Sequence, residues 1–504
     1  MKTQSTKKAL WNTWGDLVLP VFLALIFFAF VFSYYPFREK LQFDSDEGLN
    51  LMRSMLVALG HPLYREVSSD QPPLFNYILA IVFRVTGFEV NPARVLVLLF
   101  STLLVWACVQ FLRLTSERLA AIFFLPLVVM APQFLRLSTS VMIGLPSLAL
   151  AAVSMVFVVF WHRQRHSLWL VLSGFALALS VLIKLFTGFV APIFLVGITA
   201  SMYFDRRGND FSWSTFRPAW IWSVSFAALA ILLGLILVGP QNLSAITSTH
   251  IAAPVTEELA GSGYTMNAHI RAAVPLLILG ILGAVFSLYR RNWLALYPLV
   301  WAFLAYVLFS FYSPVFYHHQ LLITIPAALL AAAGVGEGLR LLSRLRSSSH
   351  LLRVETLLGA GAVIGFVLIS LHYWPTLDRD LMNRPRLTDF SLRATSGKLR
   401  VLRTMSEYID QTNWIMTDMP MYAFRVRRPV PPDVATFSSK RLATGSLTEE
   451  DILTAMRDYQ PEQVLMARFQ IPALEAYLQE HYTLILSVEF FRLFLRNDIQ
   501  PISE

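Results

Sequence analysis

The chain has 504 residues, of which 56% are hydrophobic and only 14% are charged. Because an ordinary soluble domain is about 25% charged, this composition excludes a soluble cytosolic enzyme and indicates a membrane protein. The formal net charge of +9 does not indicate a nucleic-acid partner, because basic residues gather in the cytoplasmic loops of membrane proteins for reasons of topology. With Cys108 as the single cysteine, the chain cannot form a disulfide framework or a thiolate metal cluster.

Apolar runs recur from Leu17 to Trp374, each long enough to cross a hydrocarbon core of roughly 30 Å. They predict a polytopic α-helical membrane protein with about eleven transmembrane helices. The predicted spans are 17–35, 92–112, 119–134, 141–161, 167–183, 187–204, 218–238, 272–289, 293–311, 320–339 and 354–373.

Basic residues predict the orientation of these spans. If the N-terminus is cytoplasmic, the short breaks on the opposite side contain only Arg136 and Lys184 as basic residues. The positive-inside rule and an odd number of spans then predict a protein of the inner or plasma membrane with a cytoplasmic N-terminus and an extracytoplasmic C-terminus. The cytoplasmic breaks contain Arg113, Arg118, Arg163, Arg165, Arg206, Arg207, Arg217, Arg290, Arg291, Arg340, Arg344, Arg346 and Arg353.

Two regions outside the predicted spans are large enough to fold. In the first extracytoplasmic loop, at about 37–91, residues 47–59 have the pattern of an amphipathic helix and residues 73–85 that of an apolar, interfacial helix. The second region is the tail after Trp374. We therefore expect a transmembrane domain over residues 1–374 and an extracytoplasmic α/β domain over residues 375–504.

The tail alternates between two kinds of pattern, which is typical of a small α/β domain. Its role, either positioning an acceptor or stabilising the outer face, stays open on the sequence. Helices are predicted at 398–410, 448–458 and 471–480, and β-rich runs at 413–417, 463–467 and 483–495.

Acidic residues are scarce in the membrane half, so two groups in the first loop stand out. Asp44, Asp46 and Glu47 follow the first span, and Asp70 precedes Gln71-Pro72-Pro73. A solvated acidic loop is one interpretation. The alternative is that the carboxylates converge, one acting as a base and another orienting a substrate or a cation. The two prolines favour the second interpretation, because a rigid turn holds a side chain in place.

Cationic and aromatic residues accompany these carboxylates. Arg53, Arg65, Arg136 and Lys184 could form a cationic ring that binds a phosphate beside a carboxylate base, and snorkelling to the interface is the alternative for each. The group Tyr317, His318 and His319 lies at the outer start of a span, where an interfacial aromatic belt is the simpler interpretation. The adjacent histidines point about 100° apart on a helix, so they are a poor metal pair.

The ordered set of first-loop motifs resembles a known family. Three motifs are similar, in this order, to the first periplasmic loop of GT-C glycosyltransferases related to protein O-mannosyltransferases and aminoarabinose lipid A transferases. They are Asp46-Glu47-Gly48, Gly60-His61-Pro62-Leu63-Tyr64 and Asp70-Gln71-Pro72-Pro73-Leu74. Leu182-Ile183-Lys184 resembles a Thr-Lys element of these families, and Pro314-Val315-Phe316-Tyr317-His318-His319 a late element. Gln71 stands where the families have Lys or His, and Ile183 where they have Thr.

The resemblance implies a GT-C fold and a hexosyl or pentosyl transferase of the cell envelope. It would move a sugar, with inversion, from a polyprenyl-phosphate donor in the bilayer to an extracytoplasmic lipid, glycan or protein. Asp46 would be the general base, supported by Glu47 and Asp70, while Lys184 and Arg136 would hold the lipid phosphate. Further substrate contacts are expected from Arg53, Gln71, Tyr317, His318 and His319.

The resemblance implies no metal or other cofactor. The extra carboxylates could hold a divalent cation, but we do not expect one. Two other classes of protein stay open on the sequence: a transporter or flippase of lipid-linked sugars, and a non-catalytic membrane assembly protein. A transporter would commonly show inverted repeats and polar residues at the midplane, neither of which is visible here.

Overall fold

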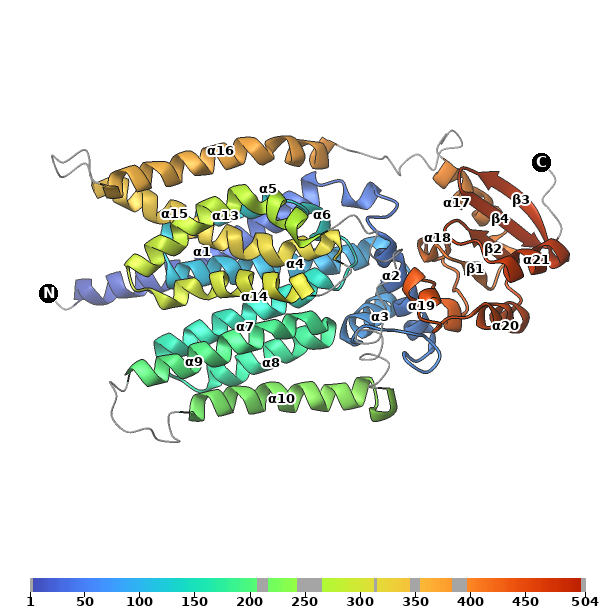
Figure 1. The fold of residues 1–504 in the computed structure, drawn as a ribbon, viewed down its shortest axis with the longest axis horizontal. Helices are drawn as coiled ribbons and strands as arrows, with labels where there is room; N and C mark the ends of the chain where they lie inside the picture. Colours follow the sequence, from blue (N-terminus) through green and yellow to red (C-terminus); the bar gives the residue numbers. More distant parts are fainter. Residues whose placement is uncertain are drawn as a thin grey trace.

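The computed structural model describes residues 3–205, 216–242, 265–311, 315–344, 354–382 and 397–499. A long helical bundle occupies one end of the molecule and a small α/β unit the other (Figure 1). Between them lie two helices of the first loop, α2 (Ser45–Leu59) and α3 (Leu74–Thr86).

Every predicted span coincides with a helix of the bundle, so the polytopic helical fold is confirmed. Within the described residues, eight segments are long and apolar enough to cross a membrane, and α1, α3, α5 and α8 provide four shorter apolar helices. The number of spans, about eleven, stays a prediction. The helices are α1 (Thr3–Tyr34), α4 (Val90–Thr115), α5 (Arg118–Met130), α6 (Phe134–Leu137), α7 (Gly144–Gln164), α8 (Leu168–Ile183), α9 (Ala191–Asp205), α10 (Arg217–Leu237), α13 (Met266–Tyr289), α14 (Tyr297–Phe311), α15 (Leu321–Arg344) and α16 (Val354–Met382).

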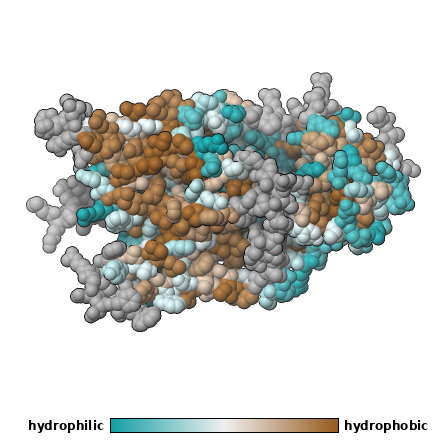
Figure 2. Space-filling model, viewed as in Figure 1, coloured by the Kyte–Doolittle hydropathy of each residue, from teal (hydrophilic) through white to brown (hydrophobic). Residues whose placement is uncertain are grey.

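The surface agrees with a membrane protein. Figure 2 shows hydrophobic residues gathered over the helical bundle and hydrophilic residues over the α/β end. Exposed apolar side chains follow α10 and α16 in particular, as in Trp220, Ile236, Leu371 and Trp374. Such a surface suits lipid, because hydrocarbon solvates it as well as another helix would.

The tail contains a four-stranded sheet in the order β1-β2-β4-β3. β1 (Ile415–Thr417) and β2 (Gln463–Met466) are parallel, and β4 (Phe491–Arg496) is antiparallel to both β2 and β3 (Tyr482–Val488). The helices are α17 (Gly397–Glu407), α18 (Pro420–Arg425), α19 (Ser439–Ala443), α20 (Glu449–Tyr459) and α21 (Pro472–His481).

The predicted α/β character of the tail is confirmed, with two additions. The run 483–495, predicted only as β-rich, is a hairpin of β3 and β4, with Glu489 at the turn in a positive φ of 54°. The short helices α18 and α19 were not predicted, since neither is long enough to show a helical period. The predicted domain boundary after residue 374 falls within α16, which continues to Met382; the division into domains stays a prediction.

The first-loop helices share one hydrophobic core with the tail and with the neighbouring ends of α4 and α8, which contribute Val97 and Ile183. Leu51 and Met55 of α2 and Phe75 of α3 are buried in one cluster with Phe424 and Leu465 of the tail. Residues 47–57 of α2, predicted to form an amphipathic helix, are therefore buried on all sides. Some residues of the charge pattern and of the family resemblance lie outside the described residues: Arg206, Arg207, Pro314, Arg346 and Arg353.

Candidate active site

A cavity of about 910 Å³ lies where the bundle, the first loop and the tail meet. The wall nearest the bundle is largely apolar and includes Met142, Leu145 and Phe186. The first loop contributes carboxylates, and the tail contributes hydroxyl and charged side chains. A single cavity thus joins an apolar wall to a polar one, which suits a ligand that is part lipid and part polar.

Asp46 lies on the first turn of α2 and lines the cavity, half-buried. Asp44 caps this helix, with its Oδ1 accepting a hydrogen bond from the Asp46 backbone N–H at 2.9 Å. Burial, and secondarily the neighbouring Asp44, raises the pKa of Asp46 to about 6, against the opposing effect of Arg53 and Lys184. A carboxyl with a pKa near neutrality is suited to general-base work.

Lys184 faces the same cavity from the break after α8. Its Nζ lies close to Gly144 at the start of α7, 3.9 Å from where a Cβ on that residue would be. Within the described part of the chain, Lys184 forms no ion pair. Burial lowers the pKa of Lys184 to about 8, opposed by Asp46 and Asp70. Lys184 is therefore a cavity-facing cation that could bind an anion.

Arg53 and Asp70 also line the cavity. Arg53 is buried, and its Nη2 lies 3.6 Å from Asp70 Oδ1. Its Nε donates to Thr436 Oγ1 at 2.9 Å, and this hydroxyl donates to the Ser68 carbonyl at 2.7 Å. Arg53 therefore links α2 to the turn that carries Asp70 and to the tail.

Gln71 lines the cavity beside Asp70. Its carbonyl oxygen accepts hydrogen bonds from the Tyr64 hydroxyl at 2.7 Å and from Ser69 Oγ at 3.1 Å. These contacts and the two following prolines hold the turn in the rigid form that the sequence predicted.

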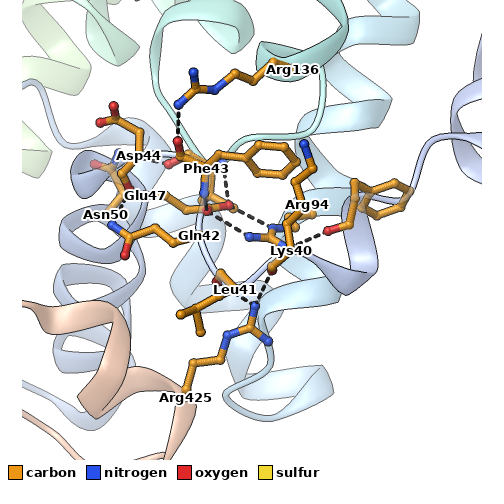
Figure 3. Close-up of polar contacts among 12 residues, drawn as sticks. Lys40, Leu41, Gln42, Phe43, Asp44, Glu47, Asn50, Arg94, Arg136 and Arg425 are labelled. Atoms are coloured by element: carbon orange, nitrogen blue, oxygen red, sulfur yellow. Dashed lines mark hydrogen bonds and ion pairs between the residues drawn. The ribbon is translucent and has the colours of Figure 1, made fainter. Parts of the chain in front are cut away.

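Glu47 does not line the cavity. It is fully buried, and both of its carboxylate oxygens pair with the fully buried guanidinium of Arg94 (Figure 3). The same carboxylate accepts from the backbone N–H groups of Phe43 at 2.8 Å and Val141 at 3.2 Å. Its position is that of a support for the loop, with no access to a substrate.

Arg136 is also absent from the cavity wall. Its guanidinium donates to the Phe43 carbonyl oxygen and stacks over the Tyr317 ring, 4.5 Å from the centroid. The predicted cationic ring is thus divided: Arg53, Arg65 and Lys184 line the cavity, whereas Arg136 lies behind it.

Tyr317, His318 and His319 all line the cavity, on a 3₁₀ turn (Tyr317–Gln320) that leads into α15. His319 accepts a hydrogen bond from the Phe316 backbone N–H at 3.1 Å through Nδ1, and its ring packs 4.5 Å from that of Phe309. The segment is therefore part of the cavity wall and not merely an interfacial belt.

The sequence did not indicate the tail residues that complete the cavity. Arg441 donates to the carbonyls of Asp433, Thr436 and Ser446 at 3.1, 3.1 and 2.8 Å, and so shapes the loop around α19. No local motif marks these residues, because they are spread over 433–468 and meet only after folding. The tail residues in the wall are Asp433, Thr436, Ser438, Ser439, Arg441, Ser446, Leu447, Asp451, Thr454, Ala455 and Arg468.

Among the described residues, no group of three or more His, Cys, Asp or Glu side chains is arranged to hold a metal ion. The two adjacent histidines of the cavity do not converge with the carboxylates of the first loop to form such a group.

Comparisons with known proteins agree with this architecture. The family model of dolichyl-phosphate-mannose-protein mannosyltransferases matches residues 70–242. Two crystal structures of ArnT from Cupriavidus metallidurans match, one bound to undecaprenyl phosphate and one in the apo state. Their TM-scores are 0.58 and 0.59, each at 15% identity. The matches cover 95% and 96% of this chain, respectively, and 98% of each ArnT chain. The chain has the GT-C fold.

A structure of a second protein with this fold is more distant. The Archaeoglobus fulgidus oligosaccharyltransferase in its apo form matches with a TM-score of 0.52 at 13% identity, covering 90% of this chain and 69% of its own. No protein of curated function matches the chain. The resemblance predicted from the first-loop motifs is confirmed at the level of the GT-C fold.

Proposed function

We propose that the protein is a glycosyltransferase that moves a sugar from a polyprenyl-phosphate donor to an extracytoplasmic acceptor, with inversion. The observation that carries this proposal is the meeting of Asp46 and Lys184 in one cavity, half of which is apolar. A base and a phosphate-binding cation beside a lipid-like wall are what such a transfer requires.

The donor enters from the bundle side in this proposal. Its polyprenyl chain lies in the bilayer and against the apolar wall, and its phosphate contacts Lys184. The ArnT structure bound to undecaprenyl phosphate supports a lipid of this class. As the bond between the sugar and the phosphate breaks, negative charge grows on the leaving phosphate, and the Lys184 ammonium stabilises it more in the transition state than in the ground state.

The acceptor enters from the tail side, where hydroxyl and charged side chains line the cavity. Asp46 takes the proton from the acceptor hydroxyl, whose oxygen attacks the anomeric carbon opposite the leaving phosphate. This single displacement inverts the anomeric configuration. Asp70, held by Arg53, helps to orient the acceptor, while Glu47 and Arg136 act from behind the wall.

The proposal also assigns a side of the membrane to the cavity. The basic breaks predict that the cavity and the tail are extracytoplasmic, and the donor sugar must then be presented at the outer face. Hydrophobic helices and the GT-C fold support integration in the membrane, whereas the orientation rests on the charge pattern alone.

The test is a transfer assay. Purified protein is incubated with radiolabelled polyprenyl-phosphate sugars, and consumption of one donor is expected. The Asp46→Asn variant should lose roughly 10²-fold to 10⁴-fold of that activity, since the amide cannot accept the proton. Asp410→Asn, an exposed tail position outside the cavity, is the matched control. Near wild-type turnover by Asp46→Asn would refute Asp46 as the base, whereas consumption of no donor by the parent protein would favour a transporter or an assembly protein.

A further inference from the structure

The segment that leads into the proposed base has no regular structure. Residues 40–43 lie between the 3₁₀ turn at Phe37–Glu39 and α2, and arginines from three separate elements hold their carbonyl oxygens (Figure 3). Arg94 of α4 donates to the Lys40 carbonyl at 2.7 Å, and Arg136 of α6 donates to that of Phe43. Because buried carbonyls need donors, these contacts determine the path of the segment.

The third arginine comes from the tail. Arg425, the last residue of α18, donates through Nη2 to the carbonyl oxygens of both Lys40 at 2.9 Å and Leu41 at 2.8 Å. These partners are 385 and 384 residues away in the chain. Arg425 does not line the cavity, so it cannot contact a ligand bound there.

A second contact joins α18 to α2 beside the base. At Gly48, two residues after Asp46, an added Cβ would lie 2.7 Å from the Met421 backbone nitrogen and 3.1 Å from its Cα. Only a residue without a side chain allows this approach, so the glycine lets the first turn of α18 sit directly against α2.

α18 is itself held on both sides. Tyr422 packs against Phe491 of β4 with ring centroids 5.1 Å apart, and Phe424 packs against Phe83 of α3 at 5.3 Å. All four rings are buried. The helix therefore transmits the position of the sheet to the first loop through packed side chains.

We infer that Arg425 is a positioning residue for Asp46, through which the C-terminal domain sets the geometry of the catalytic loop. The inference rests on the proposed function and deepens it, because it gives the tail a role in the chemical step in addition to its place in the cavity wall. Loss of the Arg425 contacts removes this donor from the Leu41 carbonyl, leaves Arg94 as the remaining donor to the Lys40 carbonyl, and displaces the first turn of α2. A displacement of about 1 Å at a reacting group can cost roughly 100-fold in rate.

The kinetic test compares Arg425→Gln with Arg428→Gln. Arg428 is also half-buried, but its hydrogen bonds within the described part of the chain all go to carbonyls of the tail, those of Arg427, Ile409 and Thr412. With the donor identified in the transfer assay, Arg425→Gln is expected to lower kcat about 10-fold to 100-fold with KM for the donor within about twofold. Arg428→Gln should leave both constants near those of the parent.

A spectroscopic test follows the loop without requiring activity. Cys108 is fully buried, so a nitroxide reagent should label only the thiol introduced by Ser45→Cys, next to Asp46 at the cavity. The label should give a more mobile spectrum when Arg425→Gln is added, and an unchanged spectrum when Arg428→Gln is added. If Arg425→Gln does not fold, Arg425→Lys replaces it, with a smaller loss of kcat because one ammonium keeps part of the contact.

The outcomes separate this inference from the proposed function. Selective effects of Arg425→Gln on kcat and on the spectrum support the positioning role. Equal effects of the two substitutions on both measurements, or none, overturn it. If the parent protein transfers no sugar, the proposed function fails. In that case, unchanged label mobility in Arg425→Gln overturns the positioning role as well. Increased mobility would instead retain the structural link between Arg425 and the loop and refute its catalytic purpose.

Discussion

Arg94 and Glu47 form a two-point ion pair in which both side chains are fully buried, with Nε to Oε1 and Nη2 to Oε2 at 2.9 Å each. Arg94 also donates to the Phe37 and Lys40 carbonyls. Since Glu47 directly follows Asp46, this pair anchors the helix turn on which the proposed base lies. Its function is structural, and the acidic character of Glu47 is needed to balance Arg94.

Removal of one partner should be severe. Arg94→Leu leaves the Glu47 carboxylate buried without its countercharge and is expected to lower the free energy of unfolding by about 3–5 kcal/mol. Thermal unfolding in detergent would measure this. Arg403→Leu, which breaks the exposed pair with Glu407, is the control and should change stability little. An Arg94→Leu protein as stable as this control would contradict the anchoring role.

Lys184 should matter for the donor. Lys184→Ala is expected to weaken binding of a polyprenyl phosphate about 10-fold to 100-fold, as for loss of a charged hydrogen bond, and Lys184→Arg should weaken it less. Titration of the purified variants with the lipid phosphate measures the dissociation constants. Lys398→Ala removes an exposed lysine of α17 outside the cavity and should bind like the parent. Equal affinity of Lys184→Ala and the parent would show that Lys184 only snorkels.

The pH dependence follows from the same two groups. Asp46 works as a base only when ionised, so kcat/KM should fall as the pH drops below about 6. Lys184 attracts phosphate only when protonated, so kcat/KM should also fall as the pH rises above about 8. In Lys184→Arg the alkaline limb should disappear, because a guanidinium stays charged throughout this range. An alkaline limb retained in that variant would belong to another group.

Gly48 tests the contact between α2 and the tail by sterics alone. Gly48→Ala places a methyl group against the Met421 backbone and should cost roughly 1–3 kcal/mol of stability, as overpacking does, together with a lower kcat. Gly234→Ala is the matched control, since Gly234 lies within α10 with no atom near its added Cβ. Unfolding midpoints and kcat of the two variants should differ; similar values would argue against the close approach.

The side of the membrane can be tested separately. The tail packs against the first loop, so both must lie on one side. A reporter enzyme that is active only outside the cytoplasm, fused after Glu504, is expected to be active. Activity of a cytoplasm-specific reporter at the same position would reverse the orientation and move the proposed reaction to the cytoplasmic face.

The sequence by itself determined the membrane bundle and the location of the first-loop motifs. Apolar runs are local signals, because a helix must satisfy its own backbone in lipid whatever its neighbours are. The same locality explains why the helices at 47–59 and 73–85 and three helices of the tail were predicted. The motifs around Asp46, Asp70 and Lys184 were recognisable as well, since each lies in a short stretch bounded by a span or a rigid turn.

Only the tertiary structure decided which of these residues meet. Glu47 pairs with Arg94 across 47 residues, and Arg425 reaches Lys40 across 385; no local pattern encodes such partners. Arg136 has the same apparent placement as Lys184 in the sequence, yet it lies behind the cavity while Lys184 faces it. The direction of a side chain depends on the packing of several helices, and that packing is a property of the whole fold rather than of any one segment.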